Sequence, residues 1–322
     1  MSQRICNWHD YNLALQKRGE LILNFNNNFL EKLYHHGGHK RGGLKKYSPH
    51  MYEYLLTIKV MFRLPWRATV GFARKLLSKV FGYPVSVPDY AHANREAKKL
   101  ALKIKDFDKN RDKEIELAFD STGVNVYTTS GYHQRKYGKD SLYRKRDQWK
   151  KIHVGLDLDS QQIISIALTE SNVNDCEVVD ELCKQVKKKV KSVRADGAYD
   201  THACHKIIHD WGAKALIPVA VDSKAQDELK RKKPKKEHLK QRDKIIKKIR
   251  RYSCFGDGLK HWKVQSGYHR RSLVESCMLR LKRIFGFNLQ HKATSGRKNE
   301  IIIKVNLLNK MAMMGMPTYE TD

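Results

Sequence analysis

The hydrophobic period of this chain changes near residue 113, and that change restricts the fold more than any other feature of the sequence. Between residues 49 and 102, apolar residues recur every three or four positions, which is the spacing of a helix with one buried face. From Ile115 to Asp120, apolar and polar residues alternate, which is typical of a strand. A polar stretch, residues 105–113, separates the two patterns. We therefore expect a helical region over residues 1–110, followed by an α/β domain over residues 111–322.

The first region contains start and stop signals for three helices. Ser48 suits the N-cap of a helix whose first position is Pro49, and the Leu64-Pro65 step predicts its end. A second helix is expected over residues 66–77, and a third, basic helix from about residue 88 to 102. Three short helices with a basic last member resemble a helix-turn-helix unit that binds DNA. A plain helical bundle is the alternative.

The second region alternates strands and helices in an order that predicts one mixed sheet. Strands are expected at residues 115–120, 124–127, 151–158, 163–168, 193–196 and 215–219, and helices at 175–188 and 202–211. The first three strands are expected to pair antiparallel, and the later strands to add in parallel. This order resembles the ribonuclease-H-like fold, so we expect an α/β domain with a mixed five-stranded sheet and flanking helices.

The positive charge of the chain points to a polyanionic partner. Lys and Arg number 64 against 34 Asp and Glu, which gives a formal net charge of +30. Nucleic acid is the commonest partner for such a surface. A membrane is the alternative, but the sequence has no apolar run of about 18 residues and no signal-peptide pattern at its start. We therefore predict a cytoplasmic protein that binds double-stranded DNA and no membrane.

Cysteine and histidine usage gives little support to a zinc site. The six cysteines are scattered, without a C-x-x-C pair, which predicts reduced thiols rather than a disulfide framework. The group His202, Cys204, His205 and His209 offers zinc ligands. It lacks a second ligand pair at the spacing of a zinc finger, which disfavours zinc.

Two segments concentrate the basic residues. Residues 221–251 contain fourteen Lys or Arg and five Asp or Glu, within an expected insertion at about residues 221–262. A second basic stretch, residues 132–146, has tyrosines among its cations. Such runs are often solvated surface, but in a chain of this charge we favour contacts with DNA phosphates. The tyrosines would also allow stacking on unpaired bases.

Two aspartates stand where strands are expected to end. Asp120 closes the alternating strand, and the Ser-Thr-Gly that follows predicts a tight turn that leaves its carboxylate at the rim of the sheet. Asp196 follows a short strand, and Gly197 permits close approach of the backbone. Mg²⁺ prefers carboxylates, and two such ions about 3.5–4 Å apart promote phosphodiester cleavage. Turn aspartates are common, so neither residue is informative alone.

A third acid lies on a polar helical stripe. Tyr268, Arg271, Glu275 and Lys282 follow the spacing Y-x2-R-x3-E-x6-K, which places them within an arc of about 60° on one helix. Apolar residues from 273 to 285 fall on the opposite side, with Leu279 as the exception. A surface helix with an Arg271–Glu275 ion pair is the alternative. It would not explain why the tyrosine and the lysine lie on the same line.

These three blocks resemble those of the insertion-sequence DDE transposases, in the subgroup named for its Y-R-E-K signature and close to the insertion-sequence-five type. Phe-Asp-Ser-Thr-Gly around Asp120 resembles the block of the first catalytic aspartate. Ala-Asp-Gly-Ala-Tyr around Asp196 resembles that of the second, whose usual pattern is D-G-x-Y. The stripe matches the third block at every spacing, with Glu275 as the catalytic glutamate. The resemblance covers about residues 113–290 well, and the N-terminal helices only in general character.

The resemblance implies a ribonuclease-H-like catalytic domain that uses two Mg²⁺ or Mn²⁺ ions. The two aspartates would bridge both ions, and Glu275 would complete one coordination shell. Tyr268, Arg271 and Lys282 would hold phosphate near the cut. The implied reaction is cleavage at the terminal inverted repeats of a bacterial insertion sequence and transfer of the freed 3′-hydroxyl into target DNA. A homodimer assembled on DNA, associated with the nucleoid, would perform it.

Two alternatives stay open at this level. A metal-dependent endonuclease would use the same site without strand transfer, and a degenerate transposase would bind the inverted repeats as a repressor without cutting. Trp262, which precedes the glutamate helix, is a candidate for stacking on a flipped base, as in related transposases, or an ordinary packed tryptophan. Residues 131–136 lack the pattern of a phosphate-binding loop, so no ATP requirement is expected.

Overall fold

A computed structural model of the chain describes residues 3–23, 25–26, 28–36, 46–108, 113–126, 149–228 and 236–321. The chain divides into two compact units, Met1–Ile104 with Ile284–Asp322, and Lys105–Arg283. The boundary expected near residue 110 lies close to this division. Residues 284–322, expected with the second domain, group with the N-terminal helices. The basic stretch at 132–146 lies outside the described residues.

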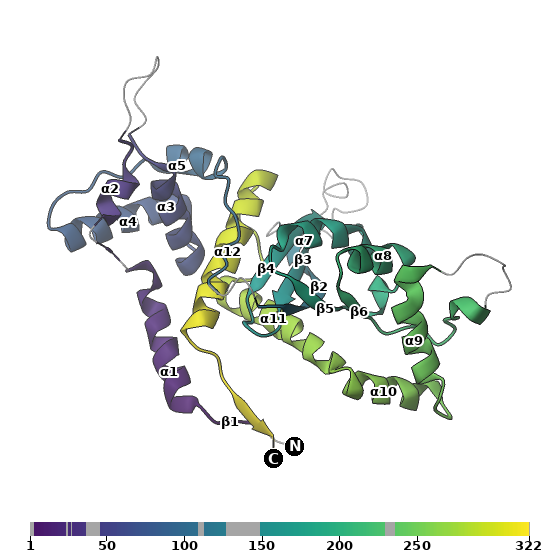
Figure 1. Cartoon of the computed structure of the whole chain (residues 1–322). Helices are drawn as coiled ribbons and strands as arrows, with labels where there is room; N and C mark the ends of the chain where they lie inside the picture. The colour runs from purple at the N-terminus through teal and green to yellow at the C-terminus, as the bar shows by residue number, and fades with distance from the viewer. Residues whose placement is uncertain are drawn as a thin grey trace, which may run out of the picture. The chain divides into compact units, whose positions relative to one another are not determined.

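The first unit is helical. Its elements are β1 (Gln3–Ile5), α1 (Trp8–Lys17), η1 (Arg18–Ile22), α2 (Phe29–Leu33), α3 (Pro49–Phe62), α4 (Trp66–Phe81), α5 (Tyr90–Ala97), α12 (Thr294–Met314) and β7 (Tyr319–Thr321) (Figure 1). The core contains Leu55, Ile58 and Leu77 from α3 and α4. β1 and β7 pair antiparallel. Within the described part of the chain, no helix has the length and apolar character needed to cross a membrane.

The predicted signals of α3 to α5 are confirmed, with differences at two helix ends. The side chain of Ser48 caps α3 by accepting a hydrogen bond from the backbone N–H of His50 at 3.2 Å. α4 runs four residues beyond its expected end, to a left-handed Gly82. α5 ends at Ala97, before the expected residue 102. There the Asn299 side chain donates to the Ala97 carbonyl at 2.9 Å, in place of the next helical N–H.

The second unit is built on a five-stranded mixed sheet. Its strands are β2 (Ile115–Asn125), β3 (Trp149–Asp157), β4 (Ile163–Glu170), β5 (Val190–Arg194) and β6 (Lys214–Leu216), in the spatial order β4-β3-β2-β5-β6. β2, β3 and β4 pair antiparallel, and β5 and β6 add in parallel, which confirms the expected pairing. The turn expected after Asp120 is wrong. β2 continues to Asn125 because β3 pairs with it along its length, up to Trp149 opposite Asn125.

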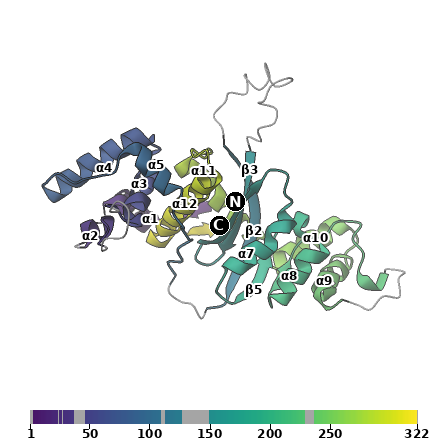
Figure 2. The ribbon, with the colours of Figure 1, turned by 90° about the horizontal axis from the view of Figure 1, so that it is seen from above.

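Helices cover both faces of this sheet (Figures 1 and 2). One face packs on α7 (Val179–Gln185) and α8 (His202–Asp210) in a core that includes Phe119, Leu182 and Ile208. The helix expected at 175–188 begins as the 3-10 turn η3 (Asp175–Val178), and η4 (Gly197–Tyr199) follows β5. The other face meets η7 (Tyr268–Arg271) and α11 (Ser272–Phe285). The predicted apolar side of α11 is buried, and Leu279 is 46% exposed, as expected of the exception.

The basic segment that begins near residue 221 folds into a small substructure with its own core. It contains η5 (Gln226–Glu228), η6 (Glu237–Leu239), α9 (Lys240–Ile249) and α10 (Phe255–Gln265). Ile245, Ile246 and Ile249 of α9 pack with Trp262 and Tyr268. The segment is therefore more than a solvated charge run, because one side of α9 is buried.

The close approach of α10 to α9 gives a test of this packing. A Cβ at Gly258 would collide with the backbone carbonyl of Ile249, whereas a Cβ at Gly256 would meet nothing nearer than Cys254 Sγ at 3.9 Å. We expect Gly258→Ala to lower the free energy of unfolding by about 2 kcal/mol through overpacking. Gly256→Ala should leave it unchanged or raise it by up to about 1 kcal/mol, because alanine favours helix. Urea unfolding followed by fluorescence measures both, and equal effects would contradict the packing.

Candidate active site

Parallel pairing of β2 with β5 brings the first two predicted acids to neighbouring positions. Ala118 pairs with Arg194, and Asp120 and Asp196 each lie two residues further along. Neighbouring strands run about 4.8 Å apart. β5 ends at Arg194, while β2 continues with Asp120 opposite Val154 of β3. Asp120 therefore lies within its strand, not at the strand end as expected, and its side chain lies on the face where Arg271 contacts it.

Asp196 caps the short turn that follows β5. One carboxylate oxygen, Oδ1, accepts a hydrogen bond from the backbone N–H of Ala198 at 2.9 Å, at the start of η4. Tyr199, at the end of η4, is fully buried in the core under α7 and α8. The turn is thus fixed at both ends, and the second oxygen of Asp196 is not used by this cap.

The third block does not lie on one α-helix as expected. Gly267 adopts a left-handed conformation with φ of 62°, and residues Tyr268–Arg271 form the 3-10 turn η7. The α-helix begins at Ser272. A 3-10 turn advances about 120° per residue rather than 100°. Tyr268 is therefore turned by about 60° relative to the predicted position, three steps of about 20° each, whereas Glu275 and Lys282, both on α11, keep their helical relation.

Arg271 joins two of the acids. Its Nη1 lies 3.0 Å from Oδ2 of Asp120, and its Nη2 donates to Oε1 of Glu275. The ion pair between Arg271 and Glu275, which the alternative of a surface helix also called for, is present. The glutamate side chain is about half exposed, with 53% of its surface accessible, whereas that of Asp120 is 15% accessible. One guanidinium thus connects a strand residue and a helix residue that are far apart in the chain.

The three acids influence one another electrostatically. Burial raises the pKa of Asp120 above its ordinary value, and the negative charges of Asp196 and Glu275 raise it further. The backbone N–H of Ser121 and the Arg271 guanidinium act in the opposite direction. The structure therefore brings all three predicted acids into one electrostatic neighbourhood, which a cation would stabilise.

Tyr268 and Trp262 are packed residues in this structure. The Tyr268 hydroxyl donates a hydrogen bond to the backbone carbonyl of Ala195 at 3.0 Å, and burial raises the pKa of this hydroxyl to about 12. The Trp262 ring lies 5.4 Å from the Tyr268 ring and is 3% exposed. Of the two readings of Trp262, the structure therefore shows the packed one.

Lys282 reaches the sheet from α11. Its Nζ donates to the Thr122 hydroxyl on β2, two residues beyond Asp120. Burial lowers the pKa of this ammonium. The side chain of Lys282 thus contacts the strand that carries Asp120, on the face that α11 covers.

Two arginines that the sequence did not single out hold η7 against the sheet. Arg194 Nε donates to the carbonyl of Gly267 at 3.1 Å. Arg270 pairs with Glu116 on β2 and with Asp159, the latter at 2.7 Å. These contacts span long stretches of the chain, and no local pattern in the sequence marks them. They fix the start of α11, and with it the height of Glu275 above the sheet.

The donor chemistry of the site suits a divalent cation, but the side chains are not arranged as a ligand set. Among the residues that the structure describes, no group of three His, Cys, Asp or Glu side chains could hold a metal ion. Around Asp120 and Glu275 the positive charge comes from Arg271 instead. Carboxylate oxygens are the ligands that Mg²⁺ and Mn²⁺ prefer, and the repulsion among the three acids would fall on metal binding.

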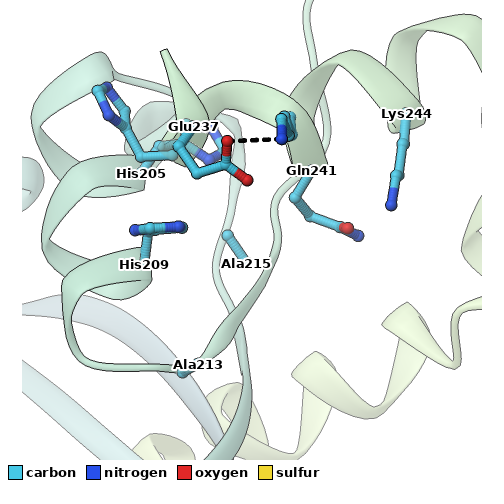
Figure 3. Close-up of a pocket in the computed structure, with 9 residues that line it drawn as sticks. His205, His209, Ala213, Ala215, Glu237, Gln241 and Lys244 are labelled. Atoms are coloured by element: carbon cyan, nitrogen blue, oxygen red, sulfur yellow. Dashed lines mark ion pairs between the residues drawn. The ribbon is translucent and has the colours of Figure 1, made fainter.

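The histidine group suggested as zinc ligands lies elsewhere, beside a hollow between α8 and α9 (Figure 3). This hollow of about 180 Å³ is lined by His205, His209, Ala213, Ala215, Glu237, His238, Lys240, Gln241 and Lys244. Cys204 is buried in the core under α8. His205 is buried as well and contacts Asp200. The four candidate ligands therefore do not converge on one point among the residues that the structure describes.

Comparison with known proteins places the chain in a family. Models described as "Transposase DDE domain" match residues 111–309 and residues 16–129. The first covers more than half of the chain, so this chain belongs to the transposase DDE domain family. The predicted family is thereby confirmed at the level of a DDE transposase domain.

Among the solved structures, one that is similar at a low level is a transposase complex. It is the "Drosophila P element transposase strand transfer complex", with 14% sequence identity over 62% of this chain and a TM-score of 0.29. The match spans 43% of that protein's chain, less than half of its length. At this TM-score the likeness supports no conclusion about fold or function.

The contact of Tyr268 with Ala195 generates a test. Tyr268→Phe leaves the buried carbonyl of Ala195 without its donor, and we expect the free energy of unfolding to fall by about 1–2 kcal/mol. Tyr252, which is 37% exposed, provides the matched control Tyr252→Phe, expected within about 0.5 kcal/mol of the parent. Urea unfolding measures both. A Tyr268→Phe chain as stable as the parent would contradict the hydrogen bond.

Proposed function

We propose that this chain is a transposase that cuts DNA at the terminal inverted repeats of an insertion sequence and joins the freed 3′-hydroxyl to target DNA. Asp120, Asp196 and Glu275 are its proposed catalytic acids. The observation that supports this most directly is the parallel register of β2 and β5, with Arg271 between the first and third acids. Membership of the transposase DDE domain family supports the same function.

The three acids are proposed to hold two Mg²⁺ or Mn²⁺ ions. Such ions supply an activated oxygen nucleophile and neutralise charge on phosphorus. Arg271 presents a planar fork of donors that suits phosphate as well as carboxylate, so it is proposed to contact DNA phosphate. Lys282 offers a compact positive charge on the same face. Tyr268 is also expected to bind phosphate. It could do so only through its hydroxyl, which in this structure donates to the carbonyl of Ala195.

The remaining architecture is proposed to serve DNA binding. The mixed sheet with helices on both faces supports the proposal of a ribonuclease-H-like catalytic domain. The Y-R-E-K subgroup and the insertion-sequence-five type are proposed from the resemblance of the third sequence block alone. In the first unit, α4 exposes Arg67, Arg74, Lys75 and Lys79, which suits a helix-turn-helix contact with the phosphate backbone. A homodimer in the bacterial cytoplasm, associated with the nucleoid, is the proposed assembly.

Neutralising any of the three acids is expected to abolish cleavage. Asp120→Asn, Asp196→Asn and Glu275→Gln remove a negative ligand with little change of shape, and we expect at least about a hundredfold loss of activity. Asp180→Asn, a matched change on the exposed surface of α7, should retain parental activity. The assay uses labelled DNA with the inverted repeats that flank the coding sequence, and MgCl₂ or MnCl₂. Parental cleavage by any of the three variants would remove that residue from the site.

The same assay separates the candidate activities. Cleavage with joining supports transposition, whereas cleavage without joining would indicate an endonuclease. A mobility shift without cleavage would indicate a DNA-binding repressor. Chelation with EDTA should stop cleavage and leave duplex binding intact, because the metal acts in the chemical step.

Duplex binding is expected to be strongly salt-dependent. A chain with a net charge of +30 neutralises several phosphates and releases their counterions. We expect affinity to fall by at least about a thousandfold between roughly 50 and 200 mM salt, as for a protein with six or more phosphate contacts. Fluorescence anisotropy with a labelled duplex measures this. An affinity that is flat over this range would rule out phosphate neutralisation as the main source of binding.

A further inference from the structure

Two contacts, one from η7 and one from the inserted basic segment, hold the turn of Asp196 on both sides. Before the acid, the carbonyl of Ala195 accepts the hydroxyl of Tyr268, which belongs to the small core of α9 and α10. After it, the carboxylate of Asp200 is bound by Arg242 of α9. Ala195 and Asp200, the two residues that receive these contacts, flank Asp196 and the short turn η4 in the sequence.

The contact with Arg242 has the geometry of a strong ion pair. Nε of Arg242 lies 2.8 Å from Oδ1 of Asp200, and Nη2 lies 3.0 Å from Oδ2. Nε2 of the buried His205 lies 2.8 Å from the same Oδ1. The side chains of Arg242 and Asp200 are 14% and 8% accessible. A two-point, largely buried pair of this kind resists displacement, because parting it would leave a charge unpaired.

Arg242 points inward, unlike its neighbours of the same charge. Its Nη1 donates to the carbonyl of Lys224 and its Nη2 to the hydroxyl of Ser223, both at 3.1 Å. Lys244, two residues further along α9, is exposed and borders the hollow in Figure 3. Within the described residues it has no hydrogen-bond or ion-pair partner. The two cations therefore differ in contacts, although the sequence presents them as one basic run.

We propose that Arg242 is a positioning residue for the candidate active site. Through Asp200 it fixes the turn that carries Asp196, and so sets the affinity of the acids for divalent metal. The basic segment then has an internal role beside any contact with DNA. This inference rests on the proposed role of Asp196 as a metal ligand.

Mn²⁺ binding to the full chain, followed by isothermal titration calorimetry without DNA, tests the proposal. Arg242→Ala should weaken Mn²⁺ binding about tenfold, the lower end of the range for residues that orient metal ligands. Arg242→Lys should lose less, because one ammonium replaces only part of the two-point contact. Asp200→Asn should resemble Arg242→Ala. The double variant should bind no more weakly than the weaker single variant, since both act through one contact.

Lys244→Ala is the matched control, because it removes the same charge from the same helix. Loss of positive charge alone would strengthen Mn²⁺ binding, opposite to the effect expected of Arg242→Ala. Thermal unfolding of each variant is recorded in parallel. A purely structural role would lower the unfolding temperature while leaving the Mn²⁺ affinity of the folded chain unchanged.

The outcomes separate this inference from the function it rests on. Equal Mn²⁺ affinities of Arg242→Ala and Lys244→Ala would overturn the positioning role while leaving the metal site intact. An Mn²⁺ titration that is the same for the parent and Asp196→Asn would overturn the proposed metal site, and the positioning role with it. A tenfold loss confined to the Arg242 and Asp200 variants would support both.

Discussion

The parallel pairing of β2 with β5 determines where the acids of this chain lie. It sets Ala118 opposite Arg194, so that Asp120 and Asp196 follow at equal distances from a shared rung. β3 holds β2 extended past that rung, and β5 turns away at Arg194 into η4. Asp120 therefore lies beyond the last residue of β2 that pairs with β5, and not at a turn in its own strand. α11 then adds Glu275 over the same face, positioned by Arg194 and Arg270.

Three neighbouring carboxylates repel one another, and the guanidinium of Arg271 reduces this repulsion. Burial and the neighbouring charges raise the pKa of Asp120, and Arg271 opposes this by contacting both Asp120 and Glu275. Guanidinium binds carboxylate and phosphate with similar geometry. One side chain can therefore act as counter-ion to the acids and, in the proposed function, as a contact for DNA.

The basic segment combines two kinds of residue that look alike in the sequence. On α9, three isoleucines and Arg242 face inward, while Lys244 and Lys247 are exposed. The inward residues connect the segment to the turn of Asp196 through Asp200. The exposed Lys244 adds to the positive field of the surface, which is where a polyanion would be attracted, whereas Lys247 is paired with Asp227. Because α9 has one buried face, basic residues of the same helix can either contact the turn of Asp196 or lie on the surface.

Much of this fold could be predicted from local pattern. The structure confirms the change of period near residue 113, the helix start at Ser48-Pro49 and the mixed pairing of the sheet. These features are predictable because a half-buried strand has apolar residues at alternate positions, and a half-buried helix has them at every third or fourth position. The ion pair of Arg271 with Glu275 is likewise local, one helical turn apart. The family was recognised from three short blocks for the same reason, since each block is contiguous.

The remaining features depend on contacts between distant segments. Three features depend on partners many residues away in the sequence. They are the continuation of β2 through Asp120, the hydrogen bond of Tyr268 to Ala195, and the ion pair of Arg242 with Asp200. No spacing rule links such partners, because their meeting depends on how strands and helices pack. The sequence therefore specified which residues carry charge and which can be buried, and the packed chain alone decided which charges face each other.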